Sequence, residues 1–362
     1  MIFQSFIIPI IKVTDSCNFS CQYCHYAQRH LNSRLMTAAE CKHIIKQCFD
    51  YNVRNHNTCM RVIFHGGEPL LQPISFYEEM LAYENELSQL SPGFTFYNSI
   101  QTNGYLVDSD WVTFFEKSKF DVGISIDGNE KYNQHYGCNG VHDSTQRVLQ
   151  NIKALNEKQI PYGVISVITN KHTESADDLY NFCVDNGIRD LSLNYCFNSD
   201  SNDTVSNEKL IPFIKRLFDL YFNGKYELNI REFNEFIAKK LGYCTDTCAT
   251  CDRSNCGQYL SFDVFGNVFF CDTEYDKNTS LGNIHSQSIY EILDSFNYLE
   301  KVFLCRKVYA DYCANCKYVS MCGGGCHRYD LRKNGEYSHN YFCPTHQALC
   351  DYISKAINVQ NV

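Results

Sequence analysis

Residues 16–24 have the sequence Ser-Cys-Asn-Phe-Ser-Cys-Gln-Tyr-Cys and follow directly on an apolar run at residues 8–13. That run is short and rich in β-branched residues, which is typical of a buried strand. The cysteines Cys17, Cys21 and Cys24 therefore fall in the loop after a first strand. Three thiolates in one loop hold three irons of a 4Fe–4S cube and leave the fourth without a protein ligand. Because catalytic metal sites keep an open position, the loop predicts a catalytic iron-sulfur centre.

A zinc site is the alternative for the same thiols. Zinc binds four ligands in a tetrahedral arrangement, and His25 or His30 is available as the fourth one. The position of the loop directly after the first strand favours the iron-sulfur centre, while the zinc alternative stays open.

Apolar segments alternate with segments of helical periodicity through the first half of the chain. Strands are expected at residues 8–13, 61–64, 94–100, 122–126, 162–168 and 191–197. Helices are expected at residues 37–51, 74–90, 108–117, 144–157 and 175–186. Six strands alternating with five helices predict βαβ units and an α/β fold with a parallel sheet, curled as a partial (β/α)6 barrel of the TIM type.

Chemistry in such a fold collects where the strands end, and unusual residues follow these strands. Gly66, Gly67 and Glu68 come after the second strand, and Ser125 and Asp127 end the fourth. Two glycines allow close backbone approach, and Glu68 offers a carboxylate to an ammonium group. The alternative is a tight turn that needs glycine, with Glu68 complementing a helix N-terminus.

The composition points to a soluble, cytoplasmic, metal-binding protein. The chain has 21 cysteines, twelve of them from Cys244 to Cys350, and no secretion signal is recognisable, so metal ligation is favoured over disulfides. A net charge of −9 without clusters of Lys and Arg argues against a nucleic-acid partner. No segment reaches about 18 consecutive apolar residues, so no membrane span is expected.

The Cys17, Cys21 and Cys24 spacing, C-x3-C-x2-C, resembles that of the radical S-adenosylmethionine (SAM) superfamily. The resemblance implies a 4Fe–4S cluster that reductively cleaves S-adenosylmethionine to a 5'-deoxyadenosyl radical. It also implies that Tyr23 lies against the adenine and that Gly66, Gly67 and Glu68 form the segment contacting the amino group of the cosubstrate. Ser125 would be a cosubstrate or substrate contact. The group that binds the cosubstrate carboxylate is not assigned, because residues 133–136 contain no arginine where related enzymes often have one.

The C-terminal cysteines resemble those of the SPASM region of anaerobic sulfatase maturases and peptide-modifying enzymes. The spacing is C-x9-G-x4-C, then C-x2-C-x5-C-x3-C, then a last cysteine. The resemblance implies two auxiliary 4Fe–4S clusters, hence three in all. The first would be held by Cys256, Cys271, Cys326 and one upstream cysteine, and the second by Cys313, Cys316, Cys322 and Cys343. Cys251 is the expected upstream ligand, with Cys248 or Cys244 as alternatives. A pair of structural zinc sites would satisfy the same thiolates.

Asp272 follows Cys271, and in sulfatase maturases the matching aspartate is a proposed general base. The resemblance therefore implies that Asp272 deprotonates a substrate thiol or hydroxyl while an auxiliary cluster removes an electron. A solvated turn aspartate is the alternative. We expect hydrogen abstraction from a peptide residue, followed by oxidation or crosslinking, as in the maturation of a ribosomal peptide natural product. Alternatives are sulfatase maturation, in which Cys or Ser becomes formylglycine, and a zinc-binding module without catalysis.

The expected organisation has three parts: a barrel core over residues 1–200, a helical connection over residues 201–243, and the SPASM domain with a C-terminal helix over residues 244–362. The expected partners are a peptide or protein substrate and an electron donor such as a flavodoxin or ferredoxin.

Overall fold

The computed structural model describes residues 6–21, 23–24, 34–133, 144–197, 204–243, 248, 253–273, 277–333 and 336–360. The chain forms two compact units. The first comprises Met1–Ser125, Gln134–Tyr162 and Gly257–Val302, and the second comprises Ile126–Asn133, Gly163–Cys256 and Phe303–Val362. Each unit thus combines segments that are distant in sequence. Among the described residues, no helix has the length and apolar character needed to cross a membrane.

The sheet of the first unit is built around strand β1 (Ile8–Thr14), every residue of which is buried. Strand β2 (Cys59–Gly66) and strand β8 (Tyr259–Phe262) pair with it on either side, both in parallel. The sheet continues in parallel through β3 (Thr95–Thr102) and β4 (Asp121–Ser125) beyond β2. Beyond β8 it ends in two short antiparallel strands, β9 (Asn267–Phe269) and β10 (Gly282–Asn283).

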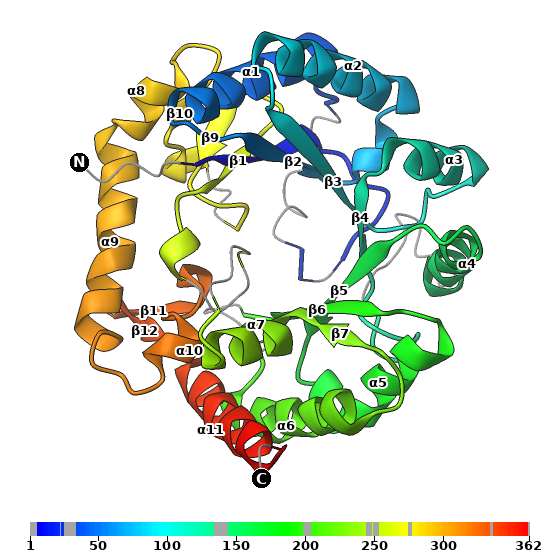
Figure 1. Cartoon of the computed structure of the whole chain (residues 1–362), viewed down its shortest axis with the longest axis vertical. Helices are drawn as coiled ribbons and strands as arrows, with labels where there is room; N and C mark the ends of the chain where they lie inside the picture. The colour runs from blue at the N-terminus through cyan, green and yellow to red at the C-terminus, as the bar shows by residue number, and fades with distance from the viewer. Residues whose placement is uncertain are drawn as a thin grey trace. The chain divides into compact units, whose positions relative to one another are not determined.

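Helices lie along one side of the strands of this unit, as Figure 1 shows for α1 to α4. They are α1 (Ala38–Arg54), α2 (Ile74–Leu90), α3 (Ser109–Ser118), α4 (Ser144–Glu157) and the short α8 (Ile289–Leu293). Helix α1 begins with a capping box formed by Thr37 and Glu40, and Cys41 and Cys48 lie on its buried face. Those two cysteines belong to the hydrophobic core.

The second unit has its own parallel strands, in the order β5 (Tyr162–Ile168), β6 (Asp190–Tyr195) and β7 (Asn229–Ile230). Its helices are α5 (Ala176–Asp185), α6 (Asn207–Asn223), α7 (Arg231–Lys240), α10 (Val319–Cys322) and α11 (Cys343–Gln360). A hairpin of β11 (Asp330–Lys333) and β12 (Glu336–Asn340) lies between α10 and α11 in the chain. Tyr195, Tyr329 and Phe342 pack together in the core of this unit.

The predicted fold class is confirmed: a succession of six parallel strands and intervening helices forms a partial (β/α)6 barrel, followed by a cysteine-rich region. Every expected strand and helix of residues 8–197 has its counterpart. Sequence analysis missed β8 and the helix α9 (Phe296–Tyr312). Strand β8 has only four residues, and its partner β1 is about 250 positions away. Helix α9 lacks a clean apolar face, because Phe296, Leu299 and Phe303 are exposed.

Candidate metal centres and active site

The loop that carries Cys17, Cys21 and Cys24 is closed at its base by backbone contacts. Thr14, at the end of β1, forms an antiparallel bridge with Leu35. The amide of Asp15 donates to the carbonyl of Arg34 at 3.3 Å, and the amide of Arg34 donates to the Asp15 carboxylate at 2.7 Å. The two ends of the loop are thus held beside each other. Gln22 and residues 25–33 lie outside the described residues.

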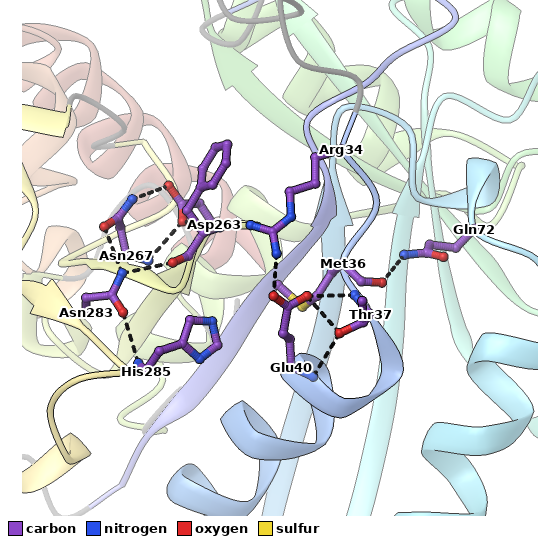
Figure 2. A network of polar contacts seen from close by, with 10 residues as sticks. Arg34, Met36, Thr37, Glu40, Gln72, Asp263, Asn267, Asn283 and His285 are labelled. Atoms are coloured by element: carbon purple, nitrogen blue, oxygen red, sulfur yellow. Dashed lines mark hydrogen bonds and ion pairs between the residues drawn. The ribbon is translucent and has the colours of Figure 1, made fainter.

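Side chains of α1 and of the turn after β8 hold Arg34, at the exit of the loop (Figure 2). Its guanidinium pairs with the carboxylate of Glu40, whose backbone and side chain also form the cap of α1. The same guanidinium lies 5.2 Å from the ring centroid of Phe265, within range of a cation–π contact. Gln72 donates to the carbonyl of Met36 at 2.8 Å, as drawn in Figure 2. The exit of the cysteine loop is therefore fixed from several neighbouring segments.

The three cysteines of the loop are half-buried. Burial raises the pKa of the Cys17 thiol, and the charges of Cys21 and Cys24 raise it further. The amide of Phe19 donates to the Cys17 sulfur at 3.3 Å, which acts in the opposite direction. Iron cations would offset the effect of the two neighbouring thiols on Cys17, so this donor set suits an iron-sulfur cluster.

Gly66 and Gly67 carry the backbone close to the base of the cysteine loop. The amide of Gly67 donates to the Thr14 carbonyl at 2.9 Å, and the amide of Glu68 donates to the Ser16 carbonyl at 2.8 Å. A Cβ atom on Gly67 would overlap the carbonyl oxygen of Ser16, and Gly66 has a φ of 133°, which L-residues avoid. Both glycines are required for this close approach.

Glu68 is completely buried and lies among hydrogen-bond donors. Its carboxylate accepts from the Leu70 amide at 2.9 Å, the Thr102 hydroxyl at 2.7 Å and the Asn103 amide at 2.8 Å. Burial raises the pKa of Glu68 to about 7, although the three donors favour its charged form. A carboxylate has about four acceptor positions, and the described residues occupy three of them, which suits an ammonium group at the fourth.

Tyr23 lies half-buried in the cysteine loop, and Ser125 ends β4. The side-chain amide of Gln101 donates to the Ser125 hydroxyl at 2.9 Å. Asp127 is buried in the second unit, where its carboxylate accepts from the Val167 amide at 2.8 Å. The Asp127 carboxylate thus anchors β5, which is a structural contact.

Asp272 is held by Lys12, a residue that sequence analysis did not assign to the site. Lys12 is 2% exposed, and its ammonium lies 3.3 Å from Asp272 Oδ1 and 3.4 Å from the Asp272 carbonyl oxygen. Burial lowers the pKa of Lys12 to about 8, against the opposing effect of the Asp272 charge. The signal in the sequence was a lysine in the middle of an apolar strand, where a charge needs a partner.

His65 completes the surroundings of Asp272. Its Nε2 lies 4.0 Å from Asp272 Oδ2, and its Nδ1 accepts from the Gly66 amide at 2.7 Å. Nδ1 also lies 3.3 Å from the Gly66 carbonyl oxygen. The Lys12 ammonium thus holds the carboxylate that follows Cys271, and the His65 ring lies beside it.

The second unit brings together four cysteines near α10. Cys313, Cys316, Cys322 and Cys343 interact electrostatically with one another, and each is half-buried. The left-handed residue Gly323 ends α10 directly after Cys322. Burial raises the pKa of Cys322 to about 12, and neighbouring thiols contribute to this shift. Burial also raises the pKa values of Cys313 and Cys343, and in both cases a neighbouring thiol adds to the effect.

A second group of thiols surrounds Cys256. Cys248, Cys326 and Cys305 all influence its pKa, which a hydrogen bond with Cys305 raises well above the ordinary value. The same bond lowers the pKa of Cys305 to about 7. The possible metal-ligand atoms of Cys256, Cys305 and His327 lie within 4.8 Å of one another. Cys305 is not part of the cysteine spacing described above. Only its contacts in the fold identify it as a possible metal ligand.

The structure leaves parts of the predicted ligand sets open. Cys251 and Cys244 fall outside the described residues, so Cys248 is the one upstream candidate whose surroundings are described. Cys271 belongs to the first unit, next to Asp272, whereas Cys256 and Cys326 belong to the second.

A buried ion pair strengthens the region between these thiol groups. Arg253 and Asp330 are each 2% exposed, and two N–H groups of the guanidinium meet both carboxylate oxygens, at 2.5 and 2.7 Å. The guanidinium also donates to the Gly324 carbonyl at 3.3 Å. Hydrogen bonding and the charge of Asp330 raise the pKa of Arg253, outweighing burial.

A family model described as the radical SAM superfamily matches residues 11–183, which include the cysteine loop, the Gly66-Gly67-Glu68 segment and Ser125. The chain contains a radical SAM domain. A second model, for an iron-sulfur cluster-binding SPASM domain, matches residues 251–317 of this radical SAM enzyme. These assignments favour iron-sulfur clusters over zinc at the cysteine sites.

Curated relatives of this radical SAM enzyme include sulfatase-maturating enzymes. The cysteine-type anaerobic sulfatase-maturating enzyme of Clostridium perfringens (strain 13 / Type A) is 25% identical over 97% of this chain and 98% of its own length. The serine-type enzyme of Bacteroides thetaiotaomicron is 26% identical over 93% of this chain and 86% of its own.

Solved structures confirm the fold. The structure titled native anSMEcpe with bound AdoMet superposes with a TM-score of 0.85 at 24% identity, covering 98% of this chain and 99% of that one. Streptococcus suis SuiB bound to precursor peptide SuiA gives a TM-score of 0.63 at 17% identity, covering 94% of this chain and 76% of that one.

The cofactors of this radical SAM enzyme are S-adenosylmethionine and 4Fe–4S clusters, which together supply a 5'-deoxyadenosyl radical when bound. The residues present fit these groups. Three thiols in one loop leave an open coordination position, Gly67 has no side chain where the backbone must pass, and the buried carboxylate of Glu68 retains an acceptor position.

Proposed function

We propose that this enzyme is an anaerobic sulfatase maturase, which oxidises the side chain of one cysteine or serine of a sulfatase to formylglycine. Relatives carrying both the cysteine-type and the serine-type name align over most of their length and most of this chain. These matches support sulfatase maturation better than the maturation of a ribosomal peptide natural product, which sequence analysis placed first. SuiB, with its precursor peptide, is matched over a smaller share of its length.

The observation that carries the proposal is the position of Asp272. It directly follows Cys271, the buried Lys12 ammonium holds its carboxylate, and the His65 ring lies beside it. A substrate thiol or hydroxyl must lose its proton as the adjacent carbon is oxidised, and an oriented carboxylate is the group that accepts it. The Lys12 ammonium lies 3.3 Å from Asp272 Oδ1 and holds that carboxylate in place for the role of base.

The chain's own residues divide the remaining work. Cys17, Cys21 and Cys24 hold the catalytic cluster, and Glu68 accepts a hydrogen bond from the ammonium group of the cosubstrate. Gly66 and Gly67 allow the backbone to approach the cosubstrate. Tyr23 lies against the adenine, and Ser125 contacts cosubstrate or substrate.

The oxidation balances as follows. The β-carbon of the substrate residue loses one hydrogen atom to the 5'-deoxyadenosyl radical, and its thiol or hydroxyl loses a proton to Asp272. The remaining electron needs an acceptor, which an auxiliary cluster would supply. Serine then becomes the aldehyde directly, whereas in cysteine water replaces the sulfur, which leaves as hydrogen sulfide.

Two auxiliary clusters would be available to accept that electron, making three 4Fe–4S clusters in all. Cys256, Cys271, Cys326 and Cys251 hold the first, with Cys248 or Cys244 as alternatives to Cys251. Cys313, Cys316, Cys322 and Cys343 hold the second, and their mutual electrostatic influence supports this set.

Three further parts of the proposal concern the electron donor, the location and the domain boundaries. We propose a flavodoxin or ferredoxin as electron donor, a cytoplasmic location, and the domain boundaries of 1–200, 201–243 and 244–362. No nucleic acid or membrane takes part.

The test uses anaerobically purified full-length enzyme with reductant, S-adenosylmethionine and a peptide that spans the target residue of a sulfatase, in a cysteine and a serine version. We expect 5'-deoxyadenosine, and an aldehyde on the peptide that reacts with a hydrazide and is located by mass spectrometry. The matched control peptide carries alanine at the target position.

Two outcomes would contradict the proposal. Formation of 5'-deoxyadenosine without any aldehyde on either peptide would reject sulfatase maturation while leaving the radical SAM assignment intact. A thioether or carbon–carbon link in the product would support the natural-product hypothesis instead.

A further inference from the structure

A buried histidine faces a cysteine sulfur in each of the two proposed auxiliary ligand sets. Nδ1 of His327 lies 3.3 Å from Sγ of Cys256, and Nδ1 of His346 lies 3.4 Å from Sγ of Cys322. All four residues belong to the second unit, so both distances are internal to one compact body. Neither histidine belongs to the cysteine spacing that defines the two clusters.

The surroundings fix His346 in this orientation. It is 2% exposed and lies in the first turn of α11, three positions after Cys343. Its amide donates to the Phe342 carbonyl at 3.0 Å, and its ring packs against Phe236 at a centroid distance of 5.8 Å. A buried ring with these neighbours has little freedom to turn its Nδ1 away from Cys322.

His327 is placed by the chain directly after Cys326. It is 8% exposed and begins a short helical turn, His327–Tyr329, whose third residue is packed in the core. Cys256, its partner, lies in another segment about 70 residues earlier. The contact therefore joins the two parts of the chain that supply ligands to the same proposed cluster.

The chemistry of a bound cluster decides the direction of both hydrogen bonds. A cysteine that ligates iron is a thiolate, which only accepts hydrogen bonds. The neutral imidazole must then carry its hydrogen on Nδ1 and donate it to sulfur. An N–H···S bond stabilises the additional negative charge of a reduced cluster, and hydrogen bonds to the sulfurs are among the factors that set cluster potential.

We propose that His327 and His346 are positioning residues that each donate one Nδ1–H···Sγ hydrogen bond to an auxiliary cluster, to Cys256 and Cys322 respectively, and so raise its reduction potential. This inference rests on the proposed auxiliary ligand sets. A higher potential makes each cluster a better acceptor for the electron that leaves the oxidised substrate, which is the task of these clusters in the proposed function.

The test measures midpoint potentials by redox titration followed with electron paramagnetic resonance. The background variant is Cys17→Ala/Cys21→Ala/Cys24→Ala, in which the remaining signals belong to auxiliary clusters. We expect His327→Leu to shift one signal to a more negative potential and His346→Leu to shift the other. His→Asn at either position retains an N–H donor near the place of Nδ1 and should recover most of the shift.

His339→Leu is the matched control. His339 is exposed on β12, in the same unit, and its Nδ1 contacts the hydroxyl of Ser338 rather than a cysteine. We expect both potentials to stay unchanged in this variant. An equal shift in His339→Leu would mean that loss of any imidazole acts through the general stability of the unit, and would overturn the inference.

A second measurement covers the case in which a leucine variant fails to assemble its clusters. In the background variant with 15N-labelled histidine, pulsed electron paramagnetic resonance of the reduced clusters should detect coupling to a histidine nitrogen. Its absence would overturn the inference, as would unshifted potentials with intact clusters. About twelve irons in the parent enzyme, from three cubes, confirm the premise, whereas about four would reject the auxiliary clusters and this inference together.

Discussion

The two cysteine regions of the molecule are built in opposite ways. Cys17, Cys21 and Cys24 lie within eight consecutive residues, in a loop whose two ends are joined by Asp15 and Arg34. The proposed C-terminal ligands are spread from Cys251 to Cys343, and the thiols around Cys256 and around Cys313 come from distant segments of the chain. A short loop suits an open catalytic centre, because few ligands are needed and the backbone leaves room for a cosubstrate. A dispersed set suits closed centres, because each cluster also crosslinks the chain.

The largest expected effect separates these two regions by removing one ligand from the loop. Cys24→Ala should abolish cleavage of S-adenosylmethionine and leave about eight of about twelve irons, since the auxiliary sets keep all their thiols. Cys183→Ala is the control, because that cysteine is buried in α5 away from any proposed ligand set. Retention of 5'-deoxyadenosine formation in Cys24→Ala would contradict the assignment of the open site.

Asp272→Asn should separate radical formation from substrate oxidation. The carboxamide cannot accept the proton, so aldehyde formation should fall by about 10²–10⁴-fold while 5'-deoxyadenosine is still produced. Lys12→Met should reduce aldehyde formation in the same sense by removing the partner of the carboxylate. Rates of both products are measured by chromatography and mass spectrometry. Asp294→Asn, at the exposed end of α8, should change neither rate.

One glycine-to-alanine change in each region compares their tolerance to an added methyl group. Gly67→Ala should lower the rate of S-adenosylmethionine cleavage by about 10²-fold or more, because the Cβ atom overlaps the backbone of Ser16 and displaces the cysteine loop. Gly324→Ala meets side-chain atoms at 3.0 Å or more, and its φ of 87° should cost about 1–3 kcal/mol in stability without loss of iron. Equal rates of S-adenosylmethionine cleavage in the two variants would contradict the expected difference between the two regions.

The pair of Arg253 and Asp330 tests how much of the C-terminal region is held by protein contacts. Arg253→Met leaves a buried carboxylate without its partner, so the free energy of unfolding should fall by about 3–5 kcal/mol. The double variant Arg253→Met/Asp330→Leu should recover most of that loss. Arg216→Met removes the exposed pair with Asp177 and should cost under about 1 kcal/mol. Denaturant titration under anaerobic conditions measures all three.

A further expected effect concerns the pH dependence of the stability of the first unit. Glu84 is 3% exposed, accepts from the Asn98 amide, and burial raises its pKa from 4.5 to about 7. The folded state therefore holds this proton between pH 4.5 and 7 while the unfolded chain releases it, so stability decreases as pH rises through that window, by about 3 kcal/mol. Glu84→Gln should flatten the slope, whereas the exposed Glu86→Gln should not. Equal slopes in the parent and both variants would contradict the shift.

Local patterns explain why so much of the barrel was predictable. Buried strands and amphipathic helices can be recognised from a few consecutive residues. In α1, for example, the capping box of Thr37 and Glu40 precedes the apolar face. Strand β8 and helix α9 carry no such signal. The four residues of β8 are too few to show the alternation of a strand. In α9, exposed apolar residues lie opposite the buried ones, so the sequence does not separate an apolar face from a polar one.

The sequence by itself determined the superfamily, the cysteine spacings and the glycines beside the cysteine loop, because each of these is a pattern of residue types at fixed positions along the chain. Only the tertiary structure showed which distant residues contact the side chains of these motifs. Lys12 meets Asp272 across 260 positions, and His327 meets Cys256 across 71. The spacing of residues in the sequence describes only groups that are near one another in the chain. The partner of a buried charge or of a cysteine sulfur is set by the fold, which brings distant residues into contact.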